Sequence, residues 1–175
     1  LALRDMGILQ ALLDANDDGV TIDALAADLD VSRYGVTVLL ESGIGGGFVH
    51  ARGDRFFATK AAWFVVHDEM TRVNFNFVRD VCYRGAQDLR TSIEEGRPAG
   101  LRHLAGTGTV YEALGDLPEP ARTSWFDFDH FYSSAAFPDV RPRVLESHPR
   151  SLLDIGGNTG KWAVFVARGS PDLHV

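Results

Sequence analysis

The residues best suited to binding a ligand form a glycine-rich run near the end of the 175-residue sequence. Residues 152–155 (Leu-Leu-Asp-Ile) predict a short buried strand. Residues 156–160 (Gly-Gly-Asn-Thr-Gly) predict a loop, and the apolar run from Trp162 predicts a helix. A strand, a glycine loop and a helix in this order place backbone N–H groups and a helix N-terminus beside a ligand.

This loop differs from the phosphate-binding Walker loop in length and in chemistry. The spacing from Gly156 to Gly160 is one residue too short, and Trp162 stands where a magnesium-binding Ser or Thr is required. Asp154 lies two positions before the first glycine, at the end of the predicted strand. A carboxylate there suits a ligand with a positive amine or with hydroxyl groups better than a pyrophosphate.

The first sixty residues predict a small helical domain that ends in a β-hairpin. Apolar spacing predicts a helix over 2–15, and Thr21 and Ser32 are candidate N-caps of a second and a third helix. Residues 48–51 and 56–59 predict two strands joined by a tight turn. Three helices followed by a hairpin is the order of a winged helix-turn-helix. The third-helix residues that we expect to face the core are Val36, Val38, Leu39 and Leu40.

The charge of this segment disfavours binding to DNA. Residues 1–60 contain five basic and nine acidic residues, a net charge of −4, whereas a phosphate-binding face is basic. The third helix offers only Arg33 to a base or a phosphate. We therefore favour an interaction domain, and a winged-helix regulator that binds DNA or senses a small ligand is the alternative.

The middle of the chain predicts helices rich in Trp and Phe. The pattern runs from a cap at Thr59 to a stop at residues 96–98 (Gly-Arg-Pro), and its aromatic faces fit either a core or a subunit interface. A Phe-rich helix follows Pro118 and Pro120, and residues 138–147 predict another short helix.

The run Asp154-x-Gly156-x-Asn158-x-Gly160 resembles motif I of the class I S-adenosylmethionine-dependent methyltransferases, whose usual form is Asp/Glu-x-Gly-x-Gly-x-Gly. Asn replaces the middle glycine, a mild departure because Asn tolerates the left-handed backbone region. The order of winged helix, hairpin, Phe-rich helix and motif I resembles O-methyltransferases with an N-terminal winged-helix dimerisation domain.

That resemblance implies a mainly α fold with three parts. They are a winged-helix and helical dimerisation domain (1–100), a helical connector (101–149) and the first β-α unit of a truncated Rossmann-like methyltransferase domain (150–175). It also implies S-adenosylmethionine as cofactor, a small-molecule acceptor methylated on a hydroxyl, and a homodimer formed through the N-terminal helices. The residues that it assigns to the cofactor are Asp154, Gly156, Gly157, Asn158 and Gly160, with Phe131, Tyr132 and Ser133 of the Phe-rich helix as further candidates.

The resemblance assigns no catalytic residue. None of the six histidines lies at the position of the family's catalytic histidine, and its ribose-binding acidic residue falls past Val175. We therefore expect the sequence to be the N-terminal part of a longer protein and to be inactive alone. A non-catalytic dimerisation protein derived from such an enzyme is a third hypothesis.

The composition of the chain disfavours several other classes of protein. The net charge of −7 gives little electrostatic help to nonspecific nucleic-acid binding, and the single cysteine excludes a cysteine zinc cluster, so we expect no metal site. No apolar run is long enough to span a membrane, and no secretory signal opens the chain. These features predict a cytoplasmic protein. The use of arginine over lysine, with only Lys60 and Lys161 present, suggests a GC-rich bacterial genome.

Overall fold

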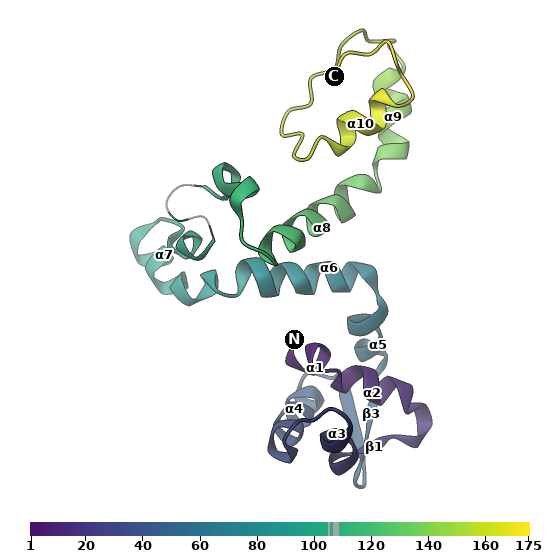
Figure 1. The fold of residues 1–175 in the computed structure, drawn as a ribbon, viewed down its shortest axis with the longest axis vertical. Helices are drawn as coiled ribbons and strands as arrows, with labels where there is room; N and C mark the ends of the chain where they lie inside the picture. Colours follow the sequence, from purple (N-terminus) through teal and green to yellow (C-terminus); the bar gives the residue numbers. More distant parts are fainter. Residues whose placement is uncertain (105, 107–108) are drawn as a thin grey trace.

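The computed structural model describes residues 1–104, 106 and 109–175, and the chain in it is mainly helical with one small sheet. Figure 1 shows an elongated molecule with an N-terminal body at one end, a layer of helices in the middle and a small C-terminal unit at the other end. The helices are α1 (Ala2–Asp5), α2 (Ile8–Asp14), α3 (Ile22–Asp28), α4 (Arg33–Gly45), α5 (Lys60–His67), α6 (Glu69–Phe77), α7 (Leu89–Glu95), α8 (Ala121–Ser134), α9 (Phe137–Leu145) and α10 (Lys161–Ala167). The strands are β1 (Val20–Thr21), β2 (Val49–Arg52) and β3 (Arg55–Ala58). Shorter 3-10 segments span Asn16–Asp18, Gly85–Asp88, Ala99–His103 and Val110–Asp116, and a π turn spans Val78–Cys82. Within the described residues, no helix combines the length and the apolar character that crossing a bilayer requires.

Side-chain caps begin three of the N-terminal helices where the sequence predicts them. The backbone N–H of Ala24 donates to the Thr21 hydroxyl at 3.3 Å, and the Gly35 N–H donates to the Ser32 hydroxyl at 3.1 Å. Thr59 caps α5 in the same way. Each cap satisfies a backbone donor that has no partner within its helix.

The three strands form an antiparallel sheet in the order β1-β3-β2. Strands β2 and β3 pair from Val49 opposite Ala58 to Arg52 opposite Arg55, so each lies one residue from its predicted position. The tight turn between them uses Gly53 at a φ of 63°, a backbone region that glycine adopts without strain.

The prediction of one helix over residues 2–15 is wrong. The structure has two helices, α1 and α2, because Gly7 takes a left-handed conformation with a φ of 78° and becomes the N-cap of α2. Helix α1 contacts α4, whereas α2 contacts α5 and β3.

The hydrophobic core of the N-terminal body lies between the helices and the sheet. Val36 and Leu40 of α4 are fully buried, as predicted, but Val38 is 40 % exposed because it lies on the outer face of the same helix. The buried residues of this core are Ile8, Leu9, Leu12, Leu25, Val36, Leu40, Val49, Ala62 and Val65.

A network of charged and polar groups joins the N-terminal body to the middle layer. The Arg4 guanidinium donates to the Asn76 side chain at 2.9 Å, and Arg79 donates to Asp5 at 3.2 Å. Arg79 also donates to both oxygens of Asp80, at 2.7 and 2.9 Å. The Ser124 hydroxyl of α8 donates to Asp80 at 2.5 Å. Hydrogen bonds from the guanidinium hold the pKa of Asp80 below its ordinary value.

Two glycines allow close contact between neighbouring 3-10 segments in the middle layer. A Cβ atom on Gly100 would lie 2.5 Å from the carbonyl oxygen of Gly85, which real side chains do not tolerate. The segment before α7 and the segment after it therefore pack backbone against backbone.

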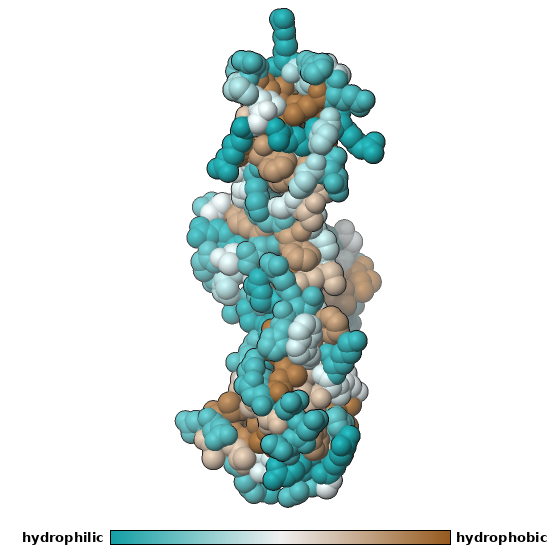
Figure 2. Space-filling model, turned by 90° about the vertical axis from the view of Figure 1, so that its right-hand side faces the viewer, coloured by the Kyte–Doolittle hydropathy of each residue, from teal (hydrophilic) through white to brown (hydrophobic). Residues whose placement is uncertain are grey.

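The C-terminal unit consists of α9, the glycine loop and α10, packed on an aromatic cluster. Phe137 of α9 lies with its ring centre 5.0 Å from that of Trp162 and 5.6 Å from that of Phe165, both on α10. Figure 2 shows apolar surface between polar side chains in the uppermost part of the molecule, where α9 and α10 lie in Figure 1.

The predicted buried strand at 152–155 does not form, which corrects the expected first β-α unit. Only Ser151 makes a bridge, in parallel with His174, and Leu153 and Ile155 are 82 % and 87 % exposed. The physical reason is that a strand requires neighbours to pair its backbone groups and cover its side chains. Among the described residues, none other than those around His174 lies alongside this segment. The predicted helix after the loop is confirmed as α10.

Candidate functional site

The glycine loop has a backbone that few residue types can adopt. Gly156, Asn158 and Gly160 have φ values of 74°, 51° and 73°, all in the left-handed region. Asn is the residue besides glycine that enters this region most readily, so the substitution in the motif fits its backbone. The loop closes with a hydrogen bond from the Gly160 N–H to the Gly157 carbonyl at 2.7 Å, and Gly160 then begins α10.

Asp154 lies beneath this loop with an unused hydrogen-bond acceptor. Its Oδ2 atom is buried and has no hydrogen-bond partner among the described residues. A Cβ atom on Gly157 would lie 2.6 Å from that oxygen, so the absence of a side chain at Gly157 makes room for the carboxylate. A buried acceptor without a partner costs free energy, and a ligand N–H or O–H group could satisfy it.

Two adjoining cavities share the loop as a wall. The smaller has a volume of about 280 Å³ and contains the predicted residues Asp154 and Ser133 in its lining. The larger has a volume of about 450 Å³. The residues that line both cavities are Asp129, Gly156, Gly157 and Asn158. Ligands bound in the two cavities would therefore lie on opposite sides of the same wall, which the loop and Asp129 form.

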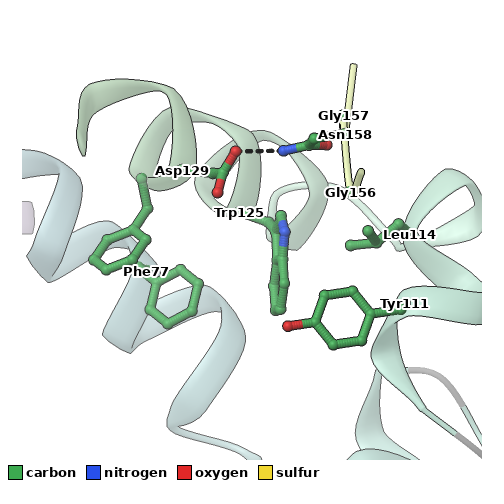
Figure 3. A pocket seen from close by; sticks show the side chains of 9 residues that line it. Phe77, Tyr111, Leu114, Trp125, Asp129, Gly156, Gly157 and Asn158 are labelled. Atoms are coloured by element: carbon green, nitrogen blue, oxygen red, sulfur yellow. Dashed lines mark hydrogen bonds between the residues drawn. The ribbon is translucent and has the colours of Figure 1, made fainter. Parts of the chain in front are cut away.

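Aromatic rings from three elements form the larger cavity (Figure 3). Phe77 of α6 stacks on Phe128 of α8 with ring centres 4.4 Å apart. Trp125 of α8 meets Tyr111 edge to face at 6.2 Å, and Leu114 from the same 3-10 segment as Tyr111 completes the apolar lining. Such a surface favours a flat apolar molecule.

Helix α8 is bonded to the glycine loop through two adjacent side chains. The Asn158 amide donates a hydrogen bond to Oδ2 of Asp129, drawn as a dashed line in Figure 3. The Thr159 hydroxyl lies 3.0 Å from Nε2 of His130. The sequence analysis selected Phe131, Tyr132 and Ser133 on this helix and missed Asp129. The signal that could have found it was the pair of carboxylates, Asp127 and Asp129, in an otherwise aromatic stretch.

The structure separates the three further candidates on α8. Ser133 lies one helical turn after Asp129 and lines the smaller cavity. Phe131 lies about 200° around the helix from Asp129 and packs edge-on against Tyr132, with ring centres 5.2 Å apart. The Tyr132 hydroxyl accepts a hydrogen bond from Asn74 of α6 at 2.7 Å. Neither Phe131 nor Tyr132 lines a cavity formed by the loop.

The basic residues of the N-terminal body are engaged by their neighbours. Arg33 pairs with Asp23, and Arg55 donates to the carbonyl oxygens of Asp18 and Gly19 at 3.0 and 2.9 Å. Arg52 lies over the ring of Phe57 at 5.3 Å. The part of the chain that the structure describes contains no group of three or more His, Cys, Asp or Glu side chains able to hold a metal ion.

Comparison with known proteins gives one match to a family model and several similarities in fold. Residues 2–56 match the family model of the Dimerisation2-like domain. A comparison with curated protein sequences finds no match.

Three solved structures illustrate the similarity in fold. The S-adenosylmethionine-dependent methyltransferase SibL in its apo form is 22 % identical with a TM-score of 0.63, and the match covers 98 % of this chain and 51 % of that one. Mitomycin 7-O-methyltransferase MmcR is 17 % identical with a TM-score of 0.64, over 98 % and 50 % of the two chains. Human N-acetylserotonin methyltransferase in complex with S-adenosylmethionine is 18 % identical with a TM-score of 0.55, over 98 % and 51 %.

The chain thus spans about half the length of the solved structures that it matches. Residues 2–56 thus match the Dimerisation2-like domain model, and the chain shares the fold of about half of the solved methyltransferase chains that it matches.

Proposed function

We propose that this chain is the N-terminal part of an S-adenosylmethionine-dependent methyltransferase that acts on a hydroxyl group of a small molecule. The observation that carries the proposal is the glycine loop shared by two cavities, one with an unused carboxylate oxygen and one lined by aromatic rings. A methyl donor and an acceptor must meet, and this arrangement brings two binding spaces to one boundary.

The residues around the smaller cavity fit S-adenosylmethionine. The buried oxygen of Asp154 supplies an acceptor for an amine or a hydroxyl group of the cofactor, and Gly156, Gly157 and Gly160 let it approach the backbone. Asn158 and Ser133 complete the set that we propose from this part of the chain. When bound, the cofactor supplies an electrophilic methyl group on a sulfonium.

The larger cavity is the proposed acceptor site. Its volume of about 450 Å³ lies within the range of about 300–1,000 Å³ typical of small-molecule sites. Trp125, Phe128 and Tyr111 would hold a flat ring and exclude water, so that the acceptor oxygen is oriented in line with the methyl group. The choice of a hydroxyl follows the O-methyltransferase named among the similar structures.

We also propose the division into a winged-helix and helical dimerisation domain (1–100), a connector (101–149) and the start of the cofactor-binding domain (150–175). The homodimer would form through the N-terminal helices. An apolar cavity of about 370 Å³ along α7 and its flanking segments supports this. Leu89, which lines it, is 60 % exposed, and Ile93, one turn further along α7, is 73 % exposed. Self-association would cover such residues.

Calorimetric titration of S-adenosylhomocysteine into the intact protein tests the proposal. We expect one binding event per chain, weakened about tenfold or more by Asp154→Asn, because the amide presents an N–H group where the ligand needs an acceptor. The matched control is Asp172→Asn, an exposed carboxylate near the C-terminus, which should bind as the wild type does. A dimer without measurable affinity would overturn the enzyme proposal in favour of a non-catalytic dimerisation protein.

The described residues offer no specific observation that favours the DNA-binding alternative. Arg33 and Arg52, the side chains that such a regulator would use, contact Asp23 and Phe57. Salt-dependent DNA binding that Arg33→Ala abolishes would be the result that revives it.

A further inference from the structure

The contact between α8 and the glycine loop is made at two consecutive positions on each element. Asp129 accepts from the Asn158 amide, and His130 lies at hydrogen-bond distance from the Thr159 hydroxyl, 3.0 Å away. Two adjacent hydrogen bonds fix both the distance and the register between α8 and the loop. A single hydrogen bond would let the loop rotate relative to the helix.

Asn158 is suited to this contact in a way that a glycine is not. Its φ of 51° lies in the region where the motif ordinarily has a glycine, and Asn enters that region at modest cost. Its side chain then reaches α8, 29 positions earlier in the chain. Asn158 therefore adopts the backbone conformation that the loop requires and also links the loop to α8 through its side chain.

Asp129 occupies a central place in the same arrangement. It lines both cavities, as do Gly156, Gly157 and Asn158. Figure 3 shows Asp129 on α8 facing Asn158, with Trp125 of the same helix below them in the cavity. Without this hydrogen bond, the glycine loop that separates the two cavities would no longer be held against α8.

We propose that the Asp129–Asn158 hydrogen bond is a latch that holds the glycine loop against α8 and fixes the wall shared by the two cavities. Asp129 is thus a positioning residue, and it acts on the cofactor through Asn158 and the loop. The inference rests on the function proposed above, because the loop must bind the cofactor for the latch to affect affinity. A loop already held in its binding conformation loses less conformational freedom when the ligand binds.

The test uses a reciprocal exchange in the intact protein. Asn158→Asp places two carboxylates face to face, so the latch should open. The double variant Asp129→Asn with Asn158→Asp restores one amide and one carboxylate with their positions reversed. The control is Asp127→Asn, because Asp127 is an exposed carboxylate on the same helix.

Two readouts separate the latch from the proposed function. Hydrogen exchange followed by mass spectrometry reports on residues 154–160 without a ligand, and calorimetry gives the affinity for S-adenosylhomocysteine. We expect Asn158→Asp to speed exchange in the loop and to weaken binding about tenfold, as for the loss of a hydrogen bond to a charged group. The double variant should recover both properties to within about threefold of the wild type.

The latch is overturned if Asn158→Asp leaves exchange and affinity unchanged, or if the double variant shows no recovery in either. Wild-type protein that binds no S-adenosylhomocysteine would contradict the proposed function instead. In that case the exchange rates of the single and double variants still decide whether the latch exists.

Discussion

Replacement of Asp80 by Asn should destabilise the protein more than the same change at an exposed ion pair. Asp80 is 6 % exposed in its side chain and accepts hydrogen bonds from two nitrogens of Arg79 and from the Ser124 hydroxyl. It therefore joins the π turn to α8 at the boundary with the N-terminal body. Asn keeps the shape of the side chain but removes its charge and replaces one acceptor by a donor.

The cost follows from these contacts. Hydrogen bonds to charged groups contribute about 1.5–3 kcal/mol each. The side chain of Arg79 is 36 % exposed, and water can replace part of what is lost, so we expect a loss of about 2 kcal/mol for the variant. The matched control is Glu94→Gln, where Glu94 pairs with Arg90 at 2.8 Å but the side chains are 57 % and 88 % exposed. That change should cost less than about 0.5 kcal/mol.

Urea unfolding of the intact protein, followed by tryptophan fluorescence, measures both values. The pKa of Asp80 is lowered in the folded protein by the hydrogen bonds from Arg79. Its contribution is therefore fully present above the unfolded pKa of about 4 and is lost as the pH falls through the lower folded value. The difference between wild type and Asp80→Asn should be constant from about pH 5 to 7 and shrink below about pH 4. Equal losses for Asp80→Asn and Glu94→Gln would refute the reasoning.

Three further substitutions test other parts of the structure. Gly157→Ala should weaken S-adenosylhomocysteine binding about tenfold in calorimetry with little change in stability, because its Cβ would displace only the Asp154 carboxylate, 2.6 Å away. Its control is Gly45→Ala, whose Cβ meets nothing within 4 Å and which should leave binding unchanged. Gly100→Ala should cost about 1–3 kcal/mol in urea unfolding, since its Cβ would meet the Gly85 backbone at 2.5 Å. Leu40→Ala should cost about 2–5 kcal/mol in the same assay, because Leu40 is fully buried in the N-terminal core. A stable Gly100→Ala or Leu40→Ala protein would contradict the described packing.

Features that depend on local chemistry could be predicted from the sequence. The caps at Thr21, Ser32 and Thr59 are confirmed. An N-cap side chain bonds to a backbone N–H two or three residues further along the chain, so the signal is local. The positions of the hairpin strands were predicted to within one residue for the same reason. The break at Gly7 was missed, since apolar spacing continues across it and hides the left-handed glycine.

Features that depend on distant parts of the chain could not be predicted. The contact of Asp80 with Ser124 joins residues 44 positions apart, and its existence depends on how α8 crosses the middle layer. The orientation of α8 on the middle layer also determines which of its faces meets the glycine loop. Ser133 therefore lines a cavity beside the loop, whereas Phe131 and Tyr132 do not. The strand expected at 152–155 failed because its formation depends on neighbours that the local sequence does not specify.

The most direct test of the proposed cofactor site is an NMR titration of the intact protein labelled with ¹⁵N at glycine. S-adenosylhomocysteine should shift the amide signals of Gly156, Gly157 and Gly160, because these N–H groups lie in the loop above Asp154. The signals of Gly45 and Gly53, in the N-terminal body, should stay in place. Saturating ligand that moves none of the three loop signals would contradict the account of the glycine loop as a cofactor site.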